Sequence, residues 1–221
     1  MAVIHHTVVK PTKLELLTSW LPSRPWYRGS ADGPAPAKAG GFRLDDPEGE
    51  VGIEFIVVTD ASGPDPTTYL VPLTYRGAAL EGAEHALVGT MEHGVLGQRW
   101  IYDACYDPVA VAQLLALIAG RAQAQDQDSS DTPDREVTAS LAGACPAHTE
   151  FTATEDQDST MLTTPQGVTL RLHRVLRPEP AADGPLLAPR GATGHVAGAW
   201  KTPEGSRVRG LFAVLRPGKR D

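Results

Sequence analysis

A short stretch near the start of the sequence gathers three aromatic residues and two arginines. They are Trp20, Arg24, Trp26, Tyr27 and Arg28, arranged around a proline-containing turn. A tryptophan face can stack on a sugar ring, and a guanidinium can hold a phosphate or a carboxylate through two hydrogen bonds. These residues predict a ligand-binding turn for a sugar or sugar phosphate. The alternative is a packed corner between a helix and a sheet.

A second candidate for anion binding is Arg171, within the strand-like run 168–178. Phosphoryl transfer needs a cation at the nucleotide phosphates, a carboxylate that orients this cation, metal ligands and a base. Arg171 keeps the charge, but its planar fork does not replace a compact lysine ammonium. The orienting carboxylate would lie on a following helix, and the four prolines and two glycines of residues 178–191 cannot sustain one. Arg171 is either a retained phosphate contact or a solvated charge on a surface strand.

Other combinations of polar residues lack the spacing of a metal site. His5 and His6 are adjacent, so their rings do not point at one ion. The pairs Glu84-His85 and Glu92-His93 do not form H-E-x-x-H and are predicted to lie in surface loops. The acidic stretch 126–137 lacks the glycine and the bidentate glutamate of a calcium loop. We therefore expect no metal, no cofactor and no catalytic residue.

Charge, hydropathy and cysteine content indicate which classes of partner are excluded and in which compartment the protein is expected. The 221 residues carry a net charge of -7, and no basic stripe interleaved with aromatics occurs, which argues against nucleic-acid binding. The sequence has no signal-like start and no segment long and apolar enough to span a bilayer. It therefore predicts a soluble, cytoplasmic protein that does not bind a membrane. Cys105 and Cys145 are far apart and are expected to be packed free thiols.

Two helices are predicted from their first turns. The first opens with Thr12 and Glu15 at capping-box spacing and ends at Pro22. The second spans 107–125, with Asp107 as the N-cap, Pro108 at the first helical position and an apolar stripe that should cover a sheet.

Alternating apolar residues predict strands over 49–59, 68–75 and 98–103, which should form an antiparallel sheet with one buried face. Residues 30–40 are small, polar and proline-rich and predict a loop, and the acidic, serine-rich segment 126–135 predicts a linker. Six further strands separated by Gly and Pro turns are expected over 137–142, 150–154, 159–164, 168–175, 195–201 and 207–215.

Two segments resemble the N-terminal cap domain of actinobacterial maltokinases. Trp20-Leu-Pro-Ser-Arg-Pro-Trp-Tyr-Arg-Gly29 is similar to the Trp-Leu-Pro-x-x-Arg-Trp-Phe stretch of that family, with Pro25 as an insertion. Gly94-Val-Leu-Gly-Gln-Arg-Trp-Ile-Tyr-Asp-Ala104 and the Asp-Pro helix start resemble the end of the cap. The resemblance covers most of residues 10–125. It implies a cystatin-like cap, in which a curved antiparallel sheet packs against a helix.

The second half resembles the small lobe of the kinase domain in the same family. Glu155-Asp-Gln-Asp-Ser-Thr160 looks like its phosphate-side loop, and Arg171 stands where its strand carries the nucleotide-phosphate lysine. Residues 194–201 and 210–215 resemble the hairpin that closes the lobe. The resemblance implies an α+β fold with a maltokinase-like cap at 1–125, a linker at 126–135 and a mostly β, degenerate small-lobe-like domain at 136–221. Arg171 would then be a vestigial phosphate position.

The large lobe that would supply the metal ligands and the base is not found in the sequence. The resemblance therefore leads us to expect a non-catalytic, stand-alone regulatory protein linked to trehalose, maltose or α-glucan metabolism. Its protein partner would be a sugar kinase or an enzyme of glucan or trehalose metabolism. Two alternatives stay open: half of a split sugar kinase completed by a separate catalytic-lobe chain, and a sugar or sugar-phosphate sensor.

Overall fold

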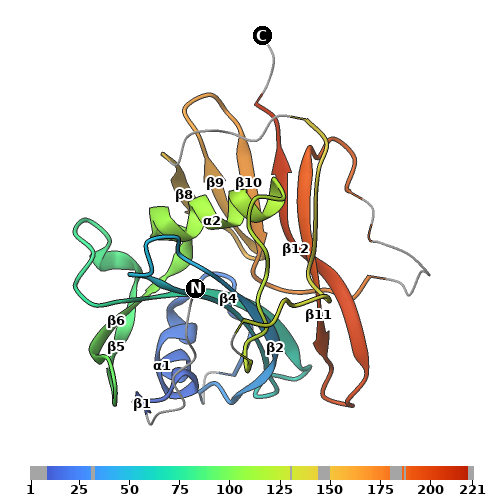
Figure 1. Cartoon of the computed structure of the whole chain (residues 1–221). Coiled ribbons are helices and arrows are strands. Elements are labelled where there is room, and N and C mark those ends of the chain that lie inside the picture. Colours follow the sequence, from blue (N-terminus) through green and yellow to red (C-terminus); the bar gives the residue numbers. More distant parts are fainter. Residues whose placement is uncertain are drawn as a thin grey trace.

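One antiparallel sheet runs through the chain in the computed structural model, which describes residues 9–30, 33–129, 131–143, 150–179, 186 and 188–218 (Figure 1). The strands of the first half are β1 (Val9–Lys10), β2 (Pro36–Leu44), β3 (Gly52–Asp60), β4 (Thr67–Arg76), β5 (Leu87–His93) and β6 (Gly97–Asp103). Those of the second half are β7 (Thr138–Leu141), β8 (Thr152–Glu155), β9 (Ser159–Thr163), β10 (Thr169–His173), β11 (Gly194–Lys201) and β12 (Arg207–Arg216). The α-helices are α1 (Lys13–Trp20) and α2 (Pro108–Ile118), and short 3-10 helices cover Leu21–Ser23, Glu84–Ala86 and Ala104–Tyr106.

In the strand order, the two halves of the chain meet where β2 lies beside β11. The sheet runs β1-β5-β6-β4-β3-β2-β11-β12-β10-β9-β8, and β7 pairs with β11. Between β2 and β11 the register contains one pair, Gly40 with Trp200. A Cβ at Gly40 would lie 3.3 Å from the carbonyl oxygen of Ala199, so a residue without a side chain lets the two backbones approach.

The first helix begins where the capping box predicts. The Thr12 hydroxyl accepts from the Glu15 backbone N–H at 3.2 Å, and the Glu15 carboxylate accepts from the Thr12 N–H at 2.7 Å. The α-helix ends at Trp20, and the chain continues as the 3-10 turn Leu21–Ser23 that contains Pro22. The predicted start and stop are confirmed.

The second helix starts at the predicted N-cap but is shorter than predicted. The Asp107 side chain accepts from the Val109 N–H, and Pro108 occupies the first turn. The helix ends at Ile118 because Gly120 adopts a left-handed φ of 69°, a conformation that terminates helices. The predicted extension to Gln125 is wrong, since Gln125 instead exchanges backbone hydrogen bonds with Arg43 of β2.

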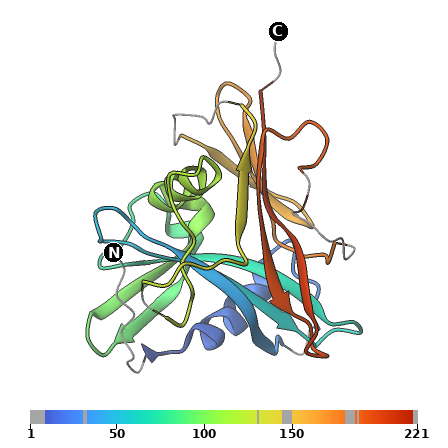
Figure 2. The ribbon, with the colours of Figure 1, turned by 45° about the vertical axis from the view of Figure 1, so that its right-hand side comes forward.

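The central strands are buried on both faces, so the prediction of one buried face is wrong. In β3, Ile53, Phe55 and Val57 point to one core, whereas Ile56 and Val58 point to another. The two helices lie on opposite sides of these strands, with α1 on the side of Ile56 and α2 on the side of Phe55 (Figures 1 and 2). Each face of the sheet therefore has its own apolar cover.

The core around α2 includes both halves of the chain. Leu114 lies beside Phe55 of β3 and also beside Leu162 of β9 and Leu172 of β10. At the other end of the helix, a Cβ on Gly194 of β11 would fall 2.6 Å from the Ile118 side chain. The predicted covering role of this helix is confirmed, and it covers the C-terminal strands as well.

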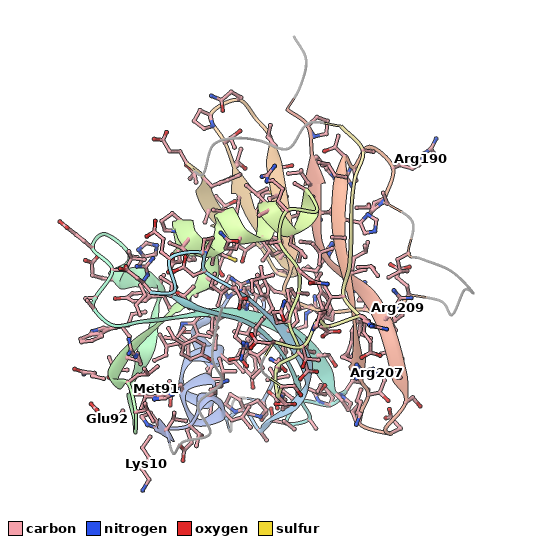
Figure 3. The ribbon with its side chains drawn as sticks, viewed as in Figure 1. Lys10, Met91, Glu92, Arg190, Arg207 and Arg209 are labelled. Atoms are coloured by element: carbon pink, nitrogen blue, oxygen red, sulfur yellow. The ribbon has the colours of Figure 1, made fainter. Side chains whose placement is uncertain are left out.

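Three strands occur where the sequence predicted none or a loop. Residues 36–44 form β2, although residues 30–40 were expected to be a loop. The Glu92-His93 pair ends β5 instead of lying in a surface loop. The short β1 covers the end of this strand, where Lys10 pairs with Glu92 (Figure 3).

The predicted α+β class is confirmed only in its antiparallel sheet with helices packed on it. The described chain is mostly β, with helices of 8 and 11 residues against twelve strands. The predicted division at the 126–135 linker stays a prediction. Within that segment the Asp126 N–H bonds to the Thr132 carbonyl at 2.7 Å.

Several predictions concern residues outside the described ones. His5, His6 and Cys145 belong to this group. Cys105 is buried and unpaired, as expected of a packed free thiol. Across the described residues, no helix is long and apolar enough to cross a bilayer, and no group of three or more His, Cys, Asp or Glu residues could hold a metal.

Candidate functional site

Four of the predicted site residues, Arg24, Trp26, Arg28 and Arg171, contact the turn between β8 and β9, which we call the acidic turn (residues 155–159). Its backbone is held by Asp156, whose carboxylate accepts from the Asp158 N–H at 2.8 Å and the Ser159 N–H at 2.7 Å. The Ser159 hydroxyl adds a bond of 2.9 Å to the same carboxylate. Asp156 therefore closes the turn from inside, in the manner of an Asx turn.

The aromatic residues of the first half pack against the start of this turn. The indole N–H of Trp26 donates to Glu155 Oε1 at 3.0 Å, and Arg24 Nη1 lies 3.8 Å from Glu155 Oε2. Arg24 also lies over the Trp20 ring, with its guanidinium carbon 4.7 Å from the ring centroid. Trp26 is fully buried and Trp20 is 6% exposed.

Two exposed arginines bind the next carboxylate of the turn. Arg28 Nη2 lies 2.6 Å from Asp158 Oδ1, and Arg177 Nη2 lies 3.3 Å from the same oxygen. The Arg28 backbone N–H donates to the hydroxyl of the fully buried Tyr69, which fixes where the arginine leaves the chain. Tyr27 is fixed as well, because its hydroxyl donates to Asp60 Oδ2 at 2.7 Å.

Arg171 is neither free nor simply solvated. Its Nη2 donates to Asp156 Oδ2 at 2.9 Å, and both side chains are about half exposed, at 40% and 50%. The single carboxylate of Asp156 therefore holds Arg171 of β10 and the backbone of the acidic turn together.

The residue that connects this site to the interior is Arg174, which the sequence analysis missed. It is fully buried, and its Nη2 donates to Asp103 Oδ2 at 2.5 Å. Its Nε donates to the Thr160 hydroxyl at 2.7 Å, and its guanidinium lies 5.1 Å from the centroid of the Trp26 ring. Strand alternation was the available signal, because position 174 has the same parity as the inward-facing Leu170 and Leu172.

The ring packing accounts for the burial of the aromatic turn. Centroid distances are 5.8 Å between Trp20 and Trp26, 5.7 Å between Trp26 and Tyr69, and 5.9 Å between Tyr27 and Tyr69. These contacts have the geometry of the packed corner weighed above as the alternative. Ligand binding by Trp20, Arg24, Trp26, Tyr27 and Arg28 stays a prediction. A sugar could stack on the fully buried Trp26 ring only if the contacts of this ring with its neighbours opened.

Residues 20–107 match the family model of the maltokinase N-terminal cap domain. The chain contains a maltokinase cap domain. The matched range begins at Trp20 of the aromatic turn and ends at Asp107, the N-cap of α2, so both resembling segments lie inside it apart from the helix that follows. The cap domain associates the chain with maltokinases and α-glucan metabolism. No curated protein matches the sequence.

The acidic turn and strands β8 to β12 lie beyond the matched residues, so their likeness to a kinase small lobe stays a prediction. The contacts between Trp26 and Glu155, Arg28 and Asp158, and Asp103 and Arg174 all cross from the cap domain to this C-terminal part. The acidic turn is thus one of the places where polar contacts hold the cap domain, beside the buried Asp103–Arg174 pair and the backbone hydrogen bond from Leu70 to Arg174.

Burial and neighbouring charges shift the pKa values of three groups where the cap domain meets the acidic turn and Arg174. Burial lowers the pKa of Arg174, but its neighbours, Asp103 first and Glu155 among them, together raise this pKa more than burial lowers it, so the guanidinium stays protonated. Burial raises the pKa of the Cys105 thiol well above its ordinary value, which keeps this neighbour of Arg174 neutral. Burial and the bond to Asp60 raise the pKa of Tyr27 to about 12.

Asp156 should make the stability of the acidic turn depend on pH. Partial burial raises the pKa of this carboxyl, but the N–H groups of Asp158 and Ser159 and the Arg171 guanidinium together lower it more. The stabilisation is therefore present above the unfolded pKa of about 3.9 and is lost as the pH falls through the lower folded value. We expect Asp156→Asn to be less stable than the wild type at pH 7 by up to about 1 kcal/mol, because the ion pair is exposed.

Urea unfolding at pH 7, 5 and 3 measures this effect. The difference between the wild type and Asp156→Asn should shrink toward zero at pH 3, and Asp65→Asn, at an exposed loop carboxylate, is the matched control. A difference that stays constant over the three pH values would contradict the role assigned to Asp156.

Proposed function

We propose that this chain is a non-catalytic binding protein that regulates an enzyme of maltose, trehalose or α-glucan metabolism. The observation that supports the proposal most directly is that the Asp156 carboxylate already binds the backbone N–H groups of the acidic turn. In the small-lobe resemblance, the turn would offer its N–H groups to nucleotide phosphates, and the cation at position 171 would neutralise them. Here the carboxylate of Asp156 accepts from Asp158, Ser159 and Arg171.

A phosphate at this place would meet two obstacles. Its oxygens would have to displace a carboxylate that already accepts two backbone N–H groups, a hydroxyl and a guanidinium N–H. The displaced carboxylate would stay nearby and repel the phosphate, because both groups are negative. Asp158 adds a second carboxylate on the same turn, and it is paired with Arg28 and Arg177. These contacts favour a role that does not require a bound nucleotide.

Binding of a partner is supported by the way the cap domain is built into the molecule. Its aromatic turn and Asp103 are fixed by buried contacts with Glu155 and Arg174, so its outer surface is presented rigidly. A rigid surface loses little conformational entropy on association. The class of partner, a sugar kinase or another enzyme of glucan or trehalose metabolism, rests on the cap family alone.

Phosphotransfer assays test the proposal. Purified chain is incubated with MgATP and maltose, glucose or glucosamine, and sugar phosphate is measured against a mock preparation. We expect no product above the mock. Product formed by the wild-type chain alone would overturn the proposal, and product formed only with a separate catalytic-lobe chain would replace it with the split-kinase alternative.

Thermal melting with MgATP examines the role of Asp156 in the same protein. A nucleotide that binds only the folded form raises the melting temperature. We expect no shift for the wild type or for Asp158→Ala, the control that leaves the turn donors bonded. Asp156→Ala frees the N–H groups of the turn and Arg171. A shift of the melting temperature in this variant alone would support the view that the Asp156 carboxylate blocks these donors in the wild type. A shift of the wild type would contradict it.

A further inference from the structure

Among the described strands, the sheet ends at β8, and one edge of this strand has no neighbouring strand. In that part of the chain, β8 pairs with β9 and with no other strand. The Asp156 N–H donates to the Ser159 carbonyl at 2.9 Å, so this pair is a hydrogen-bonded one. Antiparallel pairs alternate, which directs the N–H and C=O groups of Ala153 and Glu155 away from β9. Within the described residues, no backbone hydrogen bond reaches this outer edge.

A groove of about 470 Å³ lies beside the first half of β8. One wall is formed by Phe151 and Ala153, and the other by Tyr106 and Pro108 at the start of α2 together with His85 of the cap domain. The 3-10 turns of the cap domain and the edge strand thus enclose an apolar trough. Its position next to unpaired backbone groups is the arrangement that accepts an added strand.

The charge of the groove indicates which kind of segment could be added to β8 as a further strand. Among the described residues that line it there is no lysine or arginine, and the exposed charged one is Glu150. Glu84, next to the lining residue His85, is exposed, and bonds from backbone N–H groups lower its pKa, so it is ionised. The other lining carboxylate, Asp107, is buried and neutralised by the two bonds from Arg76. The open part of the groove is therefore negative, which favours a cationic segment.

We propose that the outer edge of β8 docks an extended, basic segment of the partner protein as an additional strand. Alternate residues of this segment would enter the trough between Ala153 and Tyr106, and intervening lysines or arginines would face Glu150 and Glu84. The four residues of β8 span about 13 Å, which admits a short segment. The inference rests on the proposed function, because it names the chemistry of that partner.

A labelled peptide of alternating valine and lysine tests the docking by fluorescence anisotropy with the full chain. We expect this peptide to bind, while the same peptide with glutamate in place of lysine, or with N-methylated alternate amides, binds at least tenfold more weakly. Equal binding of the lysine and glutamate peptides would overturn the inference. So would equal binding of the N-methylated peptide, because it cannot complete the backbone ladder.

Variants of the chain locate the site. Ala153→Pro removes an outward N–H without touching the β9 ladder and should weaken binding at least tenfold, since proline is tolerated on an edge strand. Thr154→Val, whose backbone bonds to β9, is the control and should bind like the wild type. Glu150→Lys changes no backbone group and should weaken binding of the lysine peptide even if Ala153→Pro fails to fold. Wild-type binding by Glu150→Lys, or by folded Ala153→Pro, would contradict the proposal.

Self-association is the remaining outcome. If the chain alone forms a dimer in solution and Ala153→Pro is monomeric, the edge binds a second copy and the inference is overturned. These readouts are independent of phosphotransfer. If no peptide binds and the phosphotransfer assay yields no sugar phosphate, the docking site is refuted and the proposed function still stands.

Discussion

Replacing Arg174 by methionine should lower the free energy of unfolding by about 3–5 kcal/mol, because it leaves the Asp103 carboxylate buried without a counter-charge. Both side chains are fully buried, and the pair joins the cap domain to the strands that follow it. Methionine also loses the bond to Thr160 and the contact with the Trp26 ring. For a chain of this length the melting temperature should fall by roughly 6–20 °C, which calorimetry measures.

Two further variants separate the charge effect from general damage. Arg177→Met removes an arginine that is 72% exposed, and its melting temperature should stay close to that of the wild type. The double variant Asp103→Leu/Arg174→Met removes both charges and should regain part of the lost stability. Recovery stays partial because Asp103 also accepts from the Cys105 N–H. Similar melting temperatures for Arg174→Met and Arg177→Met would show that the buried pair is not structural.

Trp26→Ala should have an effect of similar size, about 3–5 kcal/mol, because the fully buried indole leaves a large cavity. The loss includes the edge-on contact with Trp20, the tilted contact with Tyr69 and the hydrogen bond to Glu155. We expect the acidic turn to become more mobile in this variant, since Glu155 loses its buried donor. Urea unfolding gives the energy, and hydrogen exchange of residues 155–159 reports the mobility.

Trp100→Ala is the matched control for this experiment. Trp100 lies on β6 and is only partly buried, so its loss should cost clearly less. If Trp26→Ala costs no more than Trp100→Ala, the aromatic turn is not the packed corner described above. An open turn of that kind would favour the sugar-binding alternative.

Local signals in the sequence were sufficient for the starts of both helices and for most strands. The side chains of Thr12 and Glu15, and of Asp107, satisfy backbone groups within a few residues, so their effect is visible in the sequence. The end of α2 also has a local signal, Gly120, but the course of the chain up to Gln125 and the strand β2 depend on distant partners. Gln125 pairs with Arg43, and Gly40 meets Trp200, and neither contact leaves a periodic pattern.

The candidate site could be predicted only in its parts. The sequence pointed to Trp26, Arg28 and Arg171, but not to the acidic turn that holds them together. Arg174 was missed because a charged residue at the end of a strand is usually solvated, and its partner Asp103 lies 71 positions earlier. Only the folded chain brings these two charges into contact.

The apolar side of the helix α2 lies against Phe55 of the cap domain and also against Leu162 and Leu172 of the C-terminal strands. A fragment cut after Gln125 would retain the helix but lose Leu162 and Leu172, so part of this apolar side would be exposed. Such a fragment would aggregate or recruit the missing strands from a second polypeptide. Producing the cap domain on its own therefore requires new polar residues on the part of α2 that faces Leu162 and Leu172.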